Sequence, residues 1–259
     1  MRLMIIRHAD PDYYIDGLTE TGKIEAELLS QRLRKEKIDA FYVSPLGRAK
    51  KTAEYTLRAM GRESEAKELD WLQEFPDRLD VNGSEHLQKM YPGVRRKPDG
   101  TFEERVFWDI VPAGWMDDDD YFSQDTWQKT EPAVTGGMEE LCAWVWNGLD
   151  ELLAEHGYHR KGRYYTTQQG TEETIALFCH FGVTCVMLSH LWNVSPFILW
   201  HSLCLPPSSV TQIYTEERQK GIVSFRTQFA GDCSHLYAAG RKPSFAARFC
   251  ETFEQDARH

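Results

Sequence analysis

The sequence has no long apolar run, no block of basic residues and no Cys-x-x-Cys pair. No window approaches the roughly 18 apolar residues of a membrane span, and the first ten residues lack the apolar stretch of a signal peptide. We therefore expect a cytoplasmic protein without a membrane partner. The formal net charge of −10 argues against general binding to nucleic acid. An anionic ligand would need a local cluster of basic side chains.

The cysteines and histidines show no pattern that is typical of a metal site. Six cysteines are scattered over 259 residues, which indicates reduced thiols in the core rather than a disulfide framework. His156 and His159, and likewise His201 and Cys204, are three residues apart, but neither pair has the second ligand pair of a zinc site. At 41% hydrophobic residues, the chain is long enough to bury a sizeable core.

Apolar runs and helix signals alternate along the first third of the chain. Residues 3–6 and 38–44 predict buried strands, and Thr19 can cap a helix between them. This βαβ pattern predicts parallel strands. Ser44 and Pro45 predict the start of a second helix, which we expect to end near Met60.

The remaining chain adds to the same sheet. Further strands are expected at 65–69, 174–180, 210–214 and 222–229, and helices at 138–153 and from 181 to 192. We predict an α/β fold with three layers, in which a mostly parallel open sheet has helices on both faces.

Basic side chains follow the ends of several strands. His8 follows the first strand, His180 ends a later one, and Arg48 lies early in the helix after 38–44. Ligands of open parallel sheets bind beyond the carboxyl ends of the strands, so these residues should converge. Arg7 adds a second guanidinium, and two guanidiniums suit a phosphoryl group because their paired N–H donors match its oxygens.

A histidine beside arginines suits nucleophilic catalysis. Like charge disfavours protonation of His8, so one ring nitrogen can attack phosphorus while a backbone carbonyl binds the other. A carboxylic acid must then protonate the leaving oxygen. Glu68, Asp70 and Glu74 follow the third strand, and their chemistry alone does not choose among them.

Five motifs, in order, resemble the histidine phosphatase superfamily, in its phosphoglycerate mutase-like branch. They are IIRHAD at 5–10, LTETGKIEAELLSQRL at 18–33, VSPLGRAKKTAEYT at 43–56, WLQEF at 71–75 and FCHFGVT at 178–184. The resemblance implies a phosphohistidine at His8, phosphoryl binding by Arg7, Arg48 and His180, and no metal or organic cofactor. It implies that Glu74 is the proton donor and later the base, because its Leu-Gln-Glu-Phe context matches better than those of Asp70 and Asp77.

Two departures from the family pattern lie at this site. The family usually reads Arg-His-Gly-Glu-Thr and then has an Asn that reaches the phosphate, whereas Ala9 follows His8 here and the Asn position falls near Tyr14. Where the family often has His-Gly-Gly, this chain has Phe181 after His180. The first departure bears on phosphate binding and the second on substrate choice.

Residues 76–136 are irregular, and we interpret them as an inserted cap or lid within a single domain spanning 1–259. The aromatic side chains of this insert either contact the substrate or form a satellite core; they are Trp108, Trp115, Tyr121, Phe122 and Trp127. The run from Asp117 to Asp120 predicts a solvated turn rather than a metal site. Helical spacing of phenylalanines within 242–259 predicts a helix that packs on this domain or on a second copy, as in a homodimer.

These observations favour a metal-independent histidine acid phosphatase-type hydrolase. Its partner would be a small phosphorylated substrate, and water would accept the phosphoryl group. One alternative is a phosphoglycerate mutase-type phosphotransferase, which returns the group to another hydroxyl. A second is a non-catalytic phospholigand-binding protein, which the loss of His8 or Glu74 would indicate, but both residues are present.

Overall fold

The structure, a computed structural model, describes residues 1–76 and 79–244. The chain divides into two compact units. Of the described residues, the first contains 1–74, 150–184 and 204–244, and the second contains 75, 76, 79–149 and 185–203. The predicted insert, 76–136, falls within the second unit, and its role as a cap stays a prediction.

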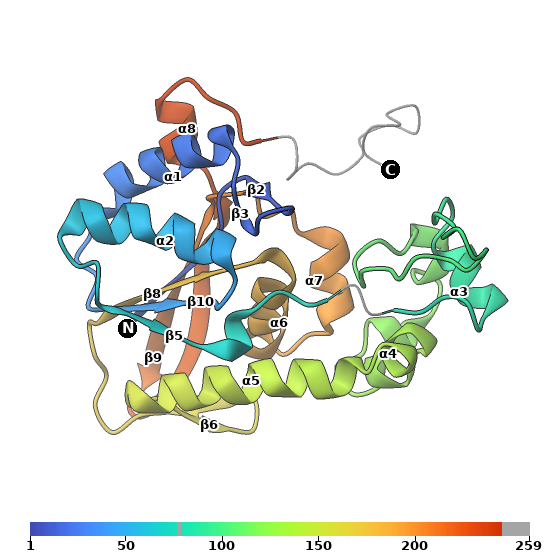
Figure 1. Ribbon diagram of the computed structural model, residues 1–259. Coiled ribbons are helices and arrows are strands. Elements are labelled where there is room, and N and C mark those ends of the chain that lie inside the picture. The colour runs from blue at the N-terminus through green and yellow to red at the C-terminus, as the bar shows by residue number, and fades with distance from the viewer. Residues whose placement is uncertain (77–78, 245–259) are drawn as a thin grey trace. The chain divides into compact units, whose positions relative to one another are not determined.

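An eight-stranded sheet in the order β5-β4-β8-β1-β9-β10-β7-β6 forms the centre of the first unit (Figure 1). β5, β4, β8 and β1 are parallel, and β9, β10, β7 and β6 pair in antiparallel fashion. The predicted α/β class with an open sheet is confirmed. The strands are β1 (Arg2–Arg7), β4 (Ala40–Val43), β5 (Ala66–Glu68), β6 (His159–Lys161), β7 (Tyr164–Thr166), β8 (Thr174–Cys179), β9 (Val210–Gln219) and β10 (Ile222–Asp232).

Helices α1 (Glu20–Leu33), α2 (Gly47–Met60) and α8 (Ser234–Ala238) also belong to the first unit. The predicted cap of α1 is confirmed, because the Thr19 hydroxyl accepts a hydrogen bond from the Gly22 amide. α1 packs against α2 and α8, and α2 also contacts β4 and β8. Gly61, with a φ of 67°, ends α2 in the left-handed conformation that glycine adopts readily. A short hairpin, β2 (Pro11–Asp12) and β3 (Gly17–Leu18), precedes α1.

The predicted role of Ser44 as a helix cap is wrong. α2 begins at Gly47, and its N-cap residue is Leu46. Ser44 is still part of the sheet edge, since its amide donates to the Phe178 carbonyl at 2.9 Å and continues the parallel ladder. The Ser44 hydroxyl does not cap α2 and is available to residues beyond the ends of the strands.

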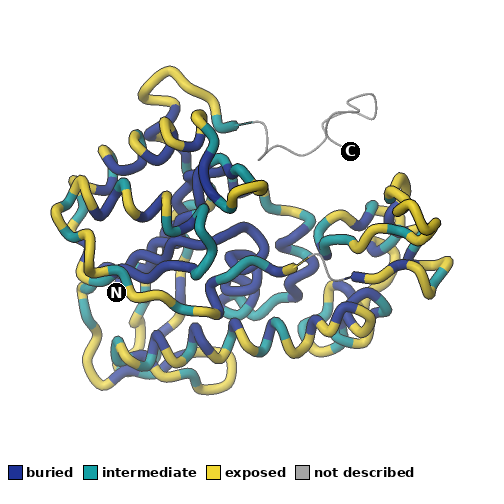
Figure 2. The backbone as a smooth tube through the Cα atoms, in the orientation of Figure 1, coloured by how far each residue is buried: buried dark blue, intermediate teal, exposed yellow. Residues whose placement is uncertain are grey.

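Apolar residues from the parallel strands and from α1 and α2 form one buried cluster. Met4 and Ile6 of β1, Phe41 of β4, Phe178 of β8 and Leu29 of α1 are all buried in it. β8 is buried at each of its six positions, which is typical of strands covered on both faces. Figure 2 shows these strands as an almost continuous buried region. Burial of this apolar surface holds the strand ends in fixed positions.

The elements that lie wholly within the second unit are short and are joined by irregular chain. They are α3 (Glu85–Met90), η2 (Pro112–Gly114), η3 (Asp119–Tyr121), η4 (Trp127–Lys129), α4 (Glu131–Thr135) and α7 (Pro196–Ser202). Trp115, Tyr121 and Trp127 are buried, and ring contacts join Trp115 to His201 and Tyr121 to Phe197 at 4.9 and 5.0 Å between centroids. These three rings therefore form a satellite core of this unit. Phe122 is exposed.

Two helices contain residues of both units, namely α5 (Met138–Glu155) and α6 (Phe181–Trp192). Both agree with the predicted helices at 138–153 and 181–192. A 3-10 turn, η1 (Asp70–Leu72), follows β5 in the first unit.

The sequence also led to expectations about a membrane span, a metal site, the cysteines and a helix within 242–259. No helix within 1–76 and 79–244 combines the length and apolar character needed to cross a membrane. In the same ranges no three His, Cys, Asp or Glu side chains are grouped so that they could hold a metal ion, and Asp117–Asp120 are exposed. Cys204 is exposed, unlike the other four described cysteines, which are buried. The predicted helix within 242–259 lies outside the described residues, apart from 242–244, which are irregular.

Candidate active site

The parallel strands bring the predicted site residues to one edge of the sheet. β1 ends beside β8 with Arg7 paired to Cys179, and β4 ends with Val43 paired to Phe178. His8 and His180 are the next residues after β1 and β8, and their ring centroids are 5.0 Å apart. The expected convergence of the two histidines is therefore observed, at the carboxyl ends of parallel strands.

His8 is buried and held by its own backbone. Its Nδ1 lies 2.8 Å from the Ala9 carbonyl oxygen, which can only accept, so Nδ1 carries the proton and Nε2 keeps its lone pair. The Ala9 amide in turn donates to the Thr52 hydroxyl at 2.9 Å. Burial, together with the charges of Arg7 and Arg48, lowers the pKa of His8 well below its usual value. The ring is neutral at pH 7 and has an unprotonated nitrogen for nucleophilic attack.

His180 is fully buried and contacts the residue that we had expected to cap α2. Its Nε2 lies 2.7 Å from the Ser44 hydroxyl, which also accepts from the Leu46 amide at 3.3 Å. Burial, followed by the nearby His8 and Arg48, lowers the pKa of His180 well below its usual value. Nδ1 of His180 is buried and has no hydrogen-bond partner among the described residues, so it is an unpaired donor in the tautomer in which the Ser44 hydroxyl donates to Nε2.

The two arginines are held differently. Arg7 donates from Nη1 to the Leu205 carbonyl at 2.5 Å, and its guanidinium carbon lies 5.7 Å from the centre of the Phe181 ring. The bulky ring that replaces the usual glycine thus lies beside Arg7. Arg48 donates from Nη1 to the Asp16 carboxylate at 2.6 Å. The Nε atoms of both arginines are buried and have no acceptor within the described residues.

The structure distinguishes among the candidate acids. The two oxygens of Glu74 accept from the amides of Gly182 and Val183 at 3.0 and 3.1 Å, in the first turn of α6. Glu74 is therefore bound to the backbone at the second and third residues after His180. Glu68 is exposed and paired with Lys50 at 2.6 Å, and Asp70 is exposed on η1. Asp77 lies outside the described residues.

Three residues of this site were missed by the sequence analysis. Ser44 was interpreted only as a helix cap, and Thr52 and Asp16 were not singled out. Thr52 supports Ala9 from one turn beyond Arg48 on α2, a contact that no local pattern predicts. Tyr14, near the position of the family's Asn, is 97% exposed, so its side chain is not a buried part of the site.

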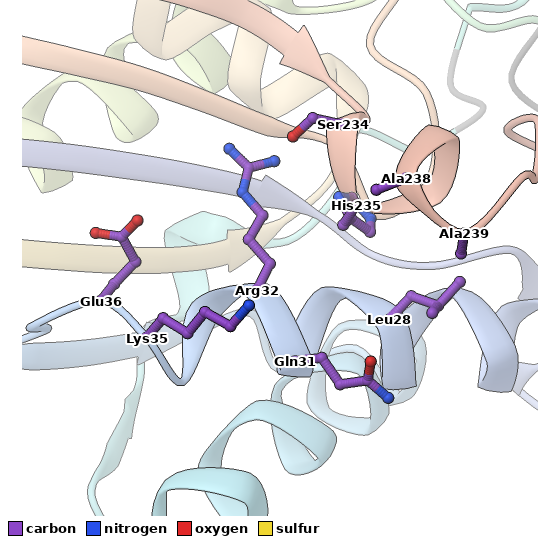
Figure 3. A pocket seen from close by; sticks show the side chains of 9 residues that line it. All are labelled: Leu28, Gln31, Arg32, Lys35, Glu36, Ser234, His235, Ala238 and Ala239. Carbon is purple, nitrogen blue, oxygen red and sulfur yellow. The ribbon is translucent and has the colours of Figure 1, made fainter.

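A separate cavity of about 470 Å³ lies between α1 and α8, and Figure 3 shows side chains of both helices around it. One of its cations is already engaged, because Arg32 pairs with Asp232 at 2.7 Å. Burial lowers the pKa of His235, which also lines it, to about 4, so this ring is neutral at pH 7.

Residues 3–90 match the sequence model of the histidine phosphatase superfamily (branch 1), which confirms the resemblance seen in the motifs. No curated protein matches the chain. Similar solved structures include a phosphoserine phosphatase mutant from Entamoeba histolytica in complex with phosphoserine. Its TM-score is 0.57 at 16% identity, covering 91% of this chain and 98% of that chain.

Two further phosphatases are also similar in structure. A mycobacterial glucosyl-3-phosphoglycerate phosphatase in complex with VO3 has a TM-score of 0.52 at 16% identity, covering 88% of this chain and 97% of that chain. A putative alpha-ribazole-5'-P phosphatase from Escherichia coli has a TM-score of 0.53 at 19% identity, covering 90% and 97%. At these identities the likeness establishes a shared fold.

Proposed function

We propose that this chain, which belongs through residues 3–90 to branch 1 of the histidine phosphatase superfamily, is a phosphatase that hydrolyses phosphate monoesters of small metabolites. The reaction would pass through a phosphohistidine at His8 and require no metal ion. The residues of this site bind the phosphoryl group and do not specify the organic part of the substrate.

One observation carries the proposal: a neutral, buried histidine with a free Nε2 lies among donors that lack acceptors. The unpaired donors are the Nε atoms of Arg7 and Arg48, and Nδ1 of His180 joins them in the tautomer in which the Ser44 hydroxyl donates to Nε2. Buried donors without partners are costly, and an anionic oxygen relieves this cost. A phosphoryl group has three such oxygens and would engage several of these donors together.

The chemistry would proceed in two steps. In the first, Nε2 of His8 forms a bond to phosphorus while the ester P–O bond breaks, and Glu74 gives its proton to the leaving alcohol oxygen. In the second, Glu74 takes a proton from water, whose oxygen attacks phosphorus as the P–N bond breaks. Arg7 and Arg48 would stabilise the charge on the phosphoryl oxygens in both steps.

The test uses an aryl phosphate and the variant His8→Ala. We expect the purified protein to hydrolyse the ester in the presence of a chelator, and His8→Ala to lower the rate by roughly 10³-fold or more. His159→Ala, which changes an exposed histidine on β6, is the matched control and should keep full activity. Brief incubation with radiolabelled substrate should leave an acid-labile, base-stable label on the wild type only. Undiminished turnover by His8→Ala would remove His8 from the mechanism.

Product analysis distinguishes hydrolysis from phosphoryl transfer to a second hydroxyl. A phosphatase releases inorganic phosphate, whereas a mutase keeps phosphate on the organic molecule. Phosphoserine, glucosyl-3-phosphoglycerate and alpha-ribazole-5'-phosphate form a first substrate panel, because they correspond to the names of the structural neighbours. A protein that binds these compounds without turnover would instead be a phospholigand-binding protein.

A further inference from the structure

The loop between β2 and β3 has an exposed tip and one anchored residue. Tyr13, Tyr14 and Ile15 expose 68%, 97% and 66% of their surface. Asp16, which follows them, has a φ of 46°, in the left-handed region that asparagine and aspartate tolerate better than most residues. The loop thus places a carboxylate where the chain turns back toward α1.

Both oxygens of the Asp16 carboxylate contact the start of α2. Oδ2 accepts from the Gly47 amide at 2.5 Å, and Oδ1 accepts from Nη1 of Arg48 at 2.6 Å. The guanidinium carbon of Arg48 also lies 5.3 Å from the centre of the Tyr13 ring. Arg48, whose side chain is only 11% exposed, is therefore held by two residues of this loop.

The carboxylate is fixed in place, as the surrounding backbone shows. A Cβ atom on Gly47 would lie 2.1 Å from the Asp16 carbonyl oxygen, so the loop and the start of α2 are in direct contact. Burial opposes ionisation of Asp16, but the hydrogen bonds from Gly47 and Arg48 outweigh it and lower the pKa of the carboxyl. An ionised group bound through both oxygens is not free to swing away from the arginine.

We infer that Asp16 is a positioning residue, which orients the guanidinium of Arg48 toward the phosphoryl group bound at His8. This inference rests on the proposed function and adds to it a residue outside the five predicted site residues. The opposite role is that Asp16 competes with phosphate for Arg48. The anchor to the Gly47 amide favours positioning, because a competitor must leave when phosphate arrives.

Binding of inorganic phosphate, measured by calorimetry, separates these two roles. If Asp16 positions Arg48, Asp16→Ala should weaken phosphate binding about tenfold, and Asp16→Asn by a smaller factor because its amide oxygen keeps one contact. If Asp16 competes, both variants should bind phosphate more tightly than the wild type. Asp12→Asn is the control, since within the described residues the Asp12 carboxylate accepts only from the Tyr14 amide of the same loop.

A double-mutant cycle tests whether Asp16 acts through Arg48. In an Arg48→Met background, which keeps the apolar stem, Asp16→Asn should have no further effect on phosphate affinity or on kcat/KM. An equal loss in both backgrounds would show that Asp16 acts elsewhere and would overturn the inference. Thermal melting establishes that each variant is folded, and Asp16→Asn decides the question if Asp16→Ala does not fold.

Failure of this inference is distinguishable from failure of the proposed function. Wild-type protein that binds phosphate and hydrolyses esters, with Asp16 variants that match it or bind more tightly, would overturn only the positioning role. Wild-type protein that neither binds phosphate nor turns over an ester would overturn both.

Discussion

The two halves of the sheet differ in what their strand ends carry. In the parallel half, β1 and β8 are followed by His8 and His180, residues far apart in sequence that meet at one edge. In the antiparallel half, β9 and β10 are neighbours in sequence joined by a tight turn, and β9 loses burial from Tyr214 onward. Parallel strands need long returning connections, so their ends gather distant residues, whereas a hairpin brings together only local ones.

The largest expected difference between the halves is in stability. Phe178→Ala in β8 removes a fully buried ring from the core cluster and should lower the free energy of unfolding by about 3–5 kcal/mol. Arg226→Ala in β10 removes only an exposed ion pair with Glu216 and should cost less than about 1 kcal/mol. Urea denaturation measures both, and Phe178→Leu serves if the alanine variant does not fold. Equal losses would mean that the antiparallel half is as tightly packed as the parallel half.

The second largest expected effect is on the rate of hydrolysis and concerns Glu74, the proposed proton donor. Glu74→Gln should slow hydrolysis of alkyl phosphates by about 10²-fold or more, because their leaving oxygen needs a proton, and slow activated aryl phosphates far less. Asp70→Asn, which changes an exposed carboxyl on η1, should leave both rates intact. Parallel losses on the two substrate classes would show that another group supplies the proton.

The smallest effect concerns His235, a buried histidine on α8, the helix that follows β10. Burial, followed by the charge of Arg32, lowers the pKa of His235 in the folded state to about 4. The unfolded chain takes up a proton near pH 6.5 and the folded chain does not, so this group makes folding less stable as pH falls below 6.5. Between pH 7 and 5 the loss should be about 2 kcal/mol.

His235→Gln should flatten the dependence of unfolding free energy on pH by that amount and leave turnover unchanged. His159→Gln, in an exposed position, should have no effect on the slope. A loss of turnover in His235→Gln would show that the α8 region contributes to activity, which we do not expect.

The predictable parts of this molecule are those with a strong local signal. Continuous apolar runs predicted β1 and β8, and the residues after them followed from the rule for parallel sheets. The role of Thr19 as the N-cap of α1 was predicted because a helix cap depends on residues that are close in sequence. β6 and β7 were missed, since each has only three residues and forms only by pairing, β7 with β10 and β6 with β7.

The supporting residues of the site were missed for a different reason. Asp16 and Arg48 are 32 residues apart, and their contact exists only once α2 has packed beside the β2–β3 loop. Ser44 had a valid local interpretation as a cap, but tertiary structure uses its hydroxyl to bind His180. Sequence patterns thus pointed to the groups that we propose to bind phosphate and missed the residues that contact those groups, because such contacts arise only on folding.

The position of β1 has a consequence for how the protein is made. This strand comes first in the chain, yet its two neighbours in the sheet are β8 and β9, more than 160 residues later. A ribosome must therefore release most of the polypeptide before the central strand gains either partner, and such distant pairings form slowly. Nascent chains that stop short of β8 should contain His8, but without the His180 ring that lies beside it at the end of the parallel strands.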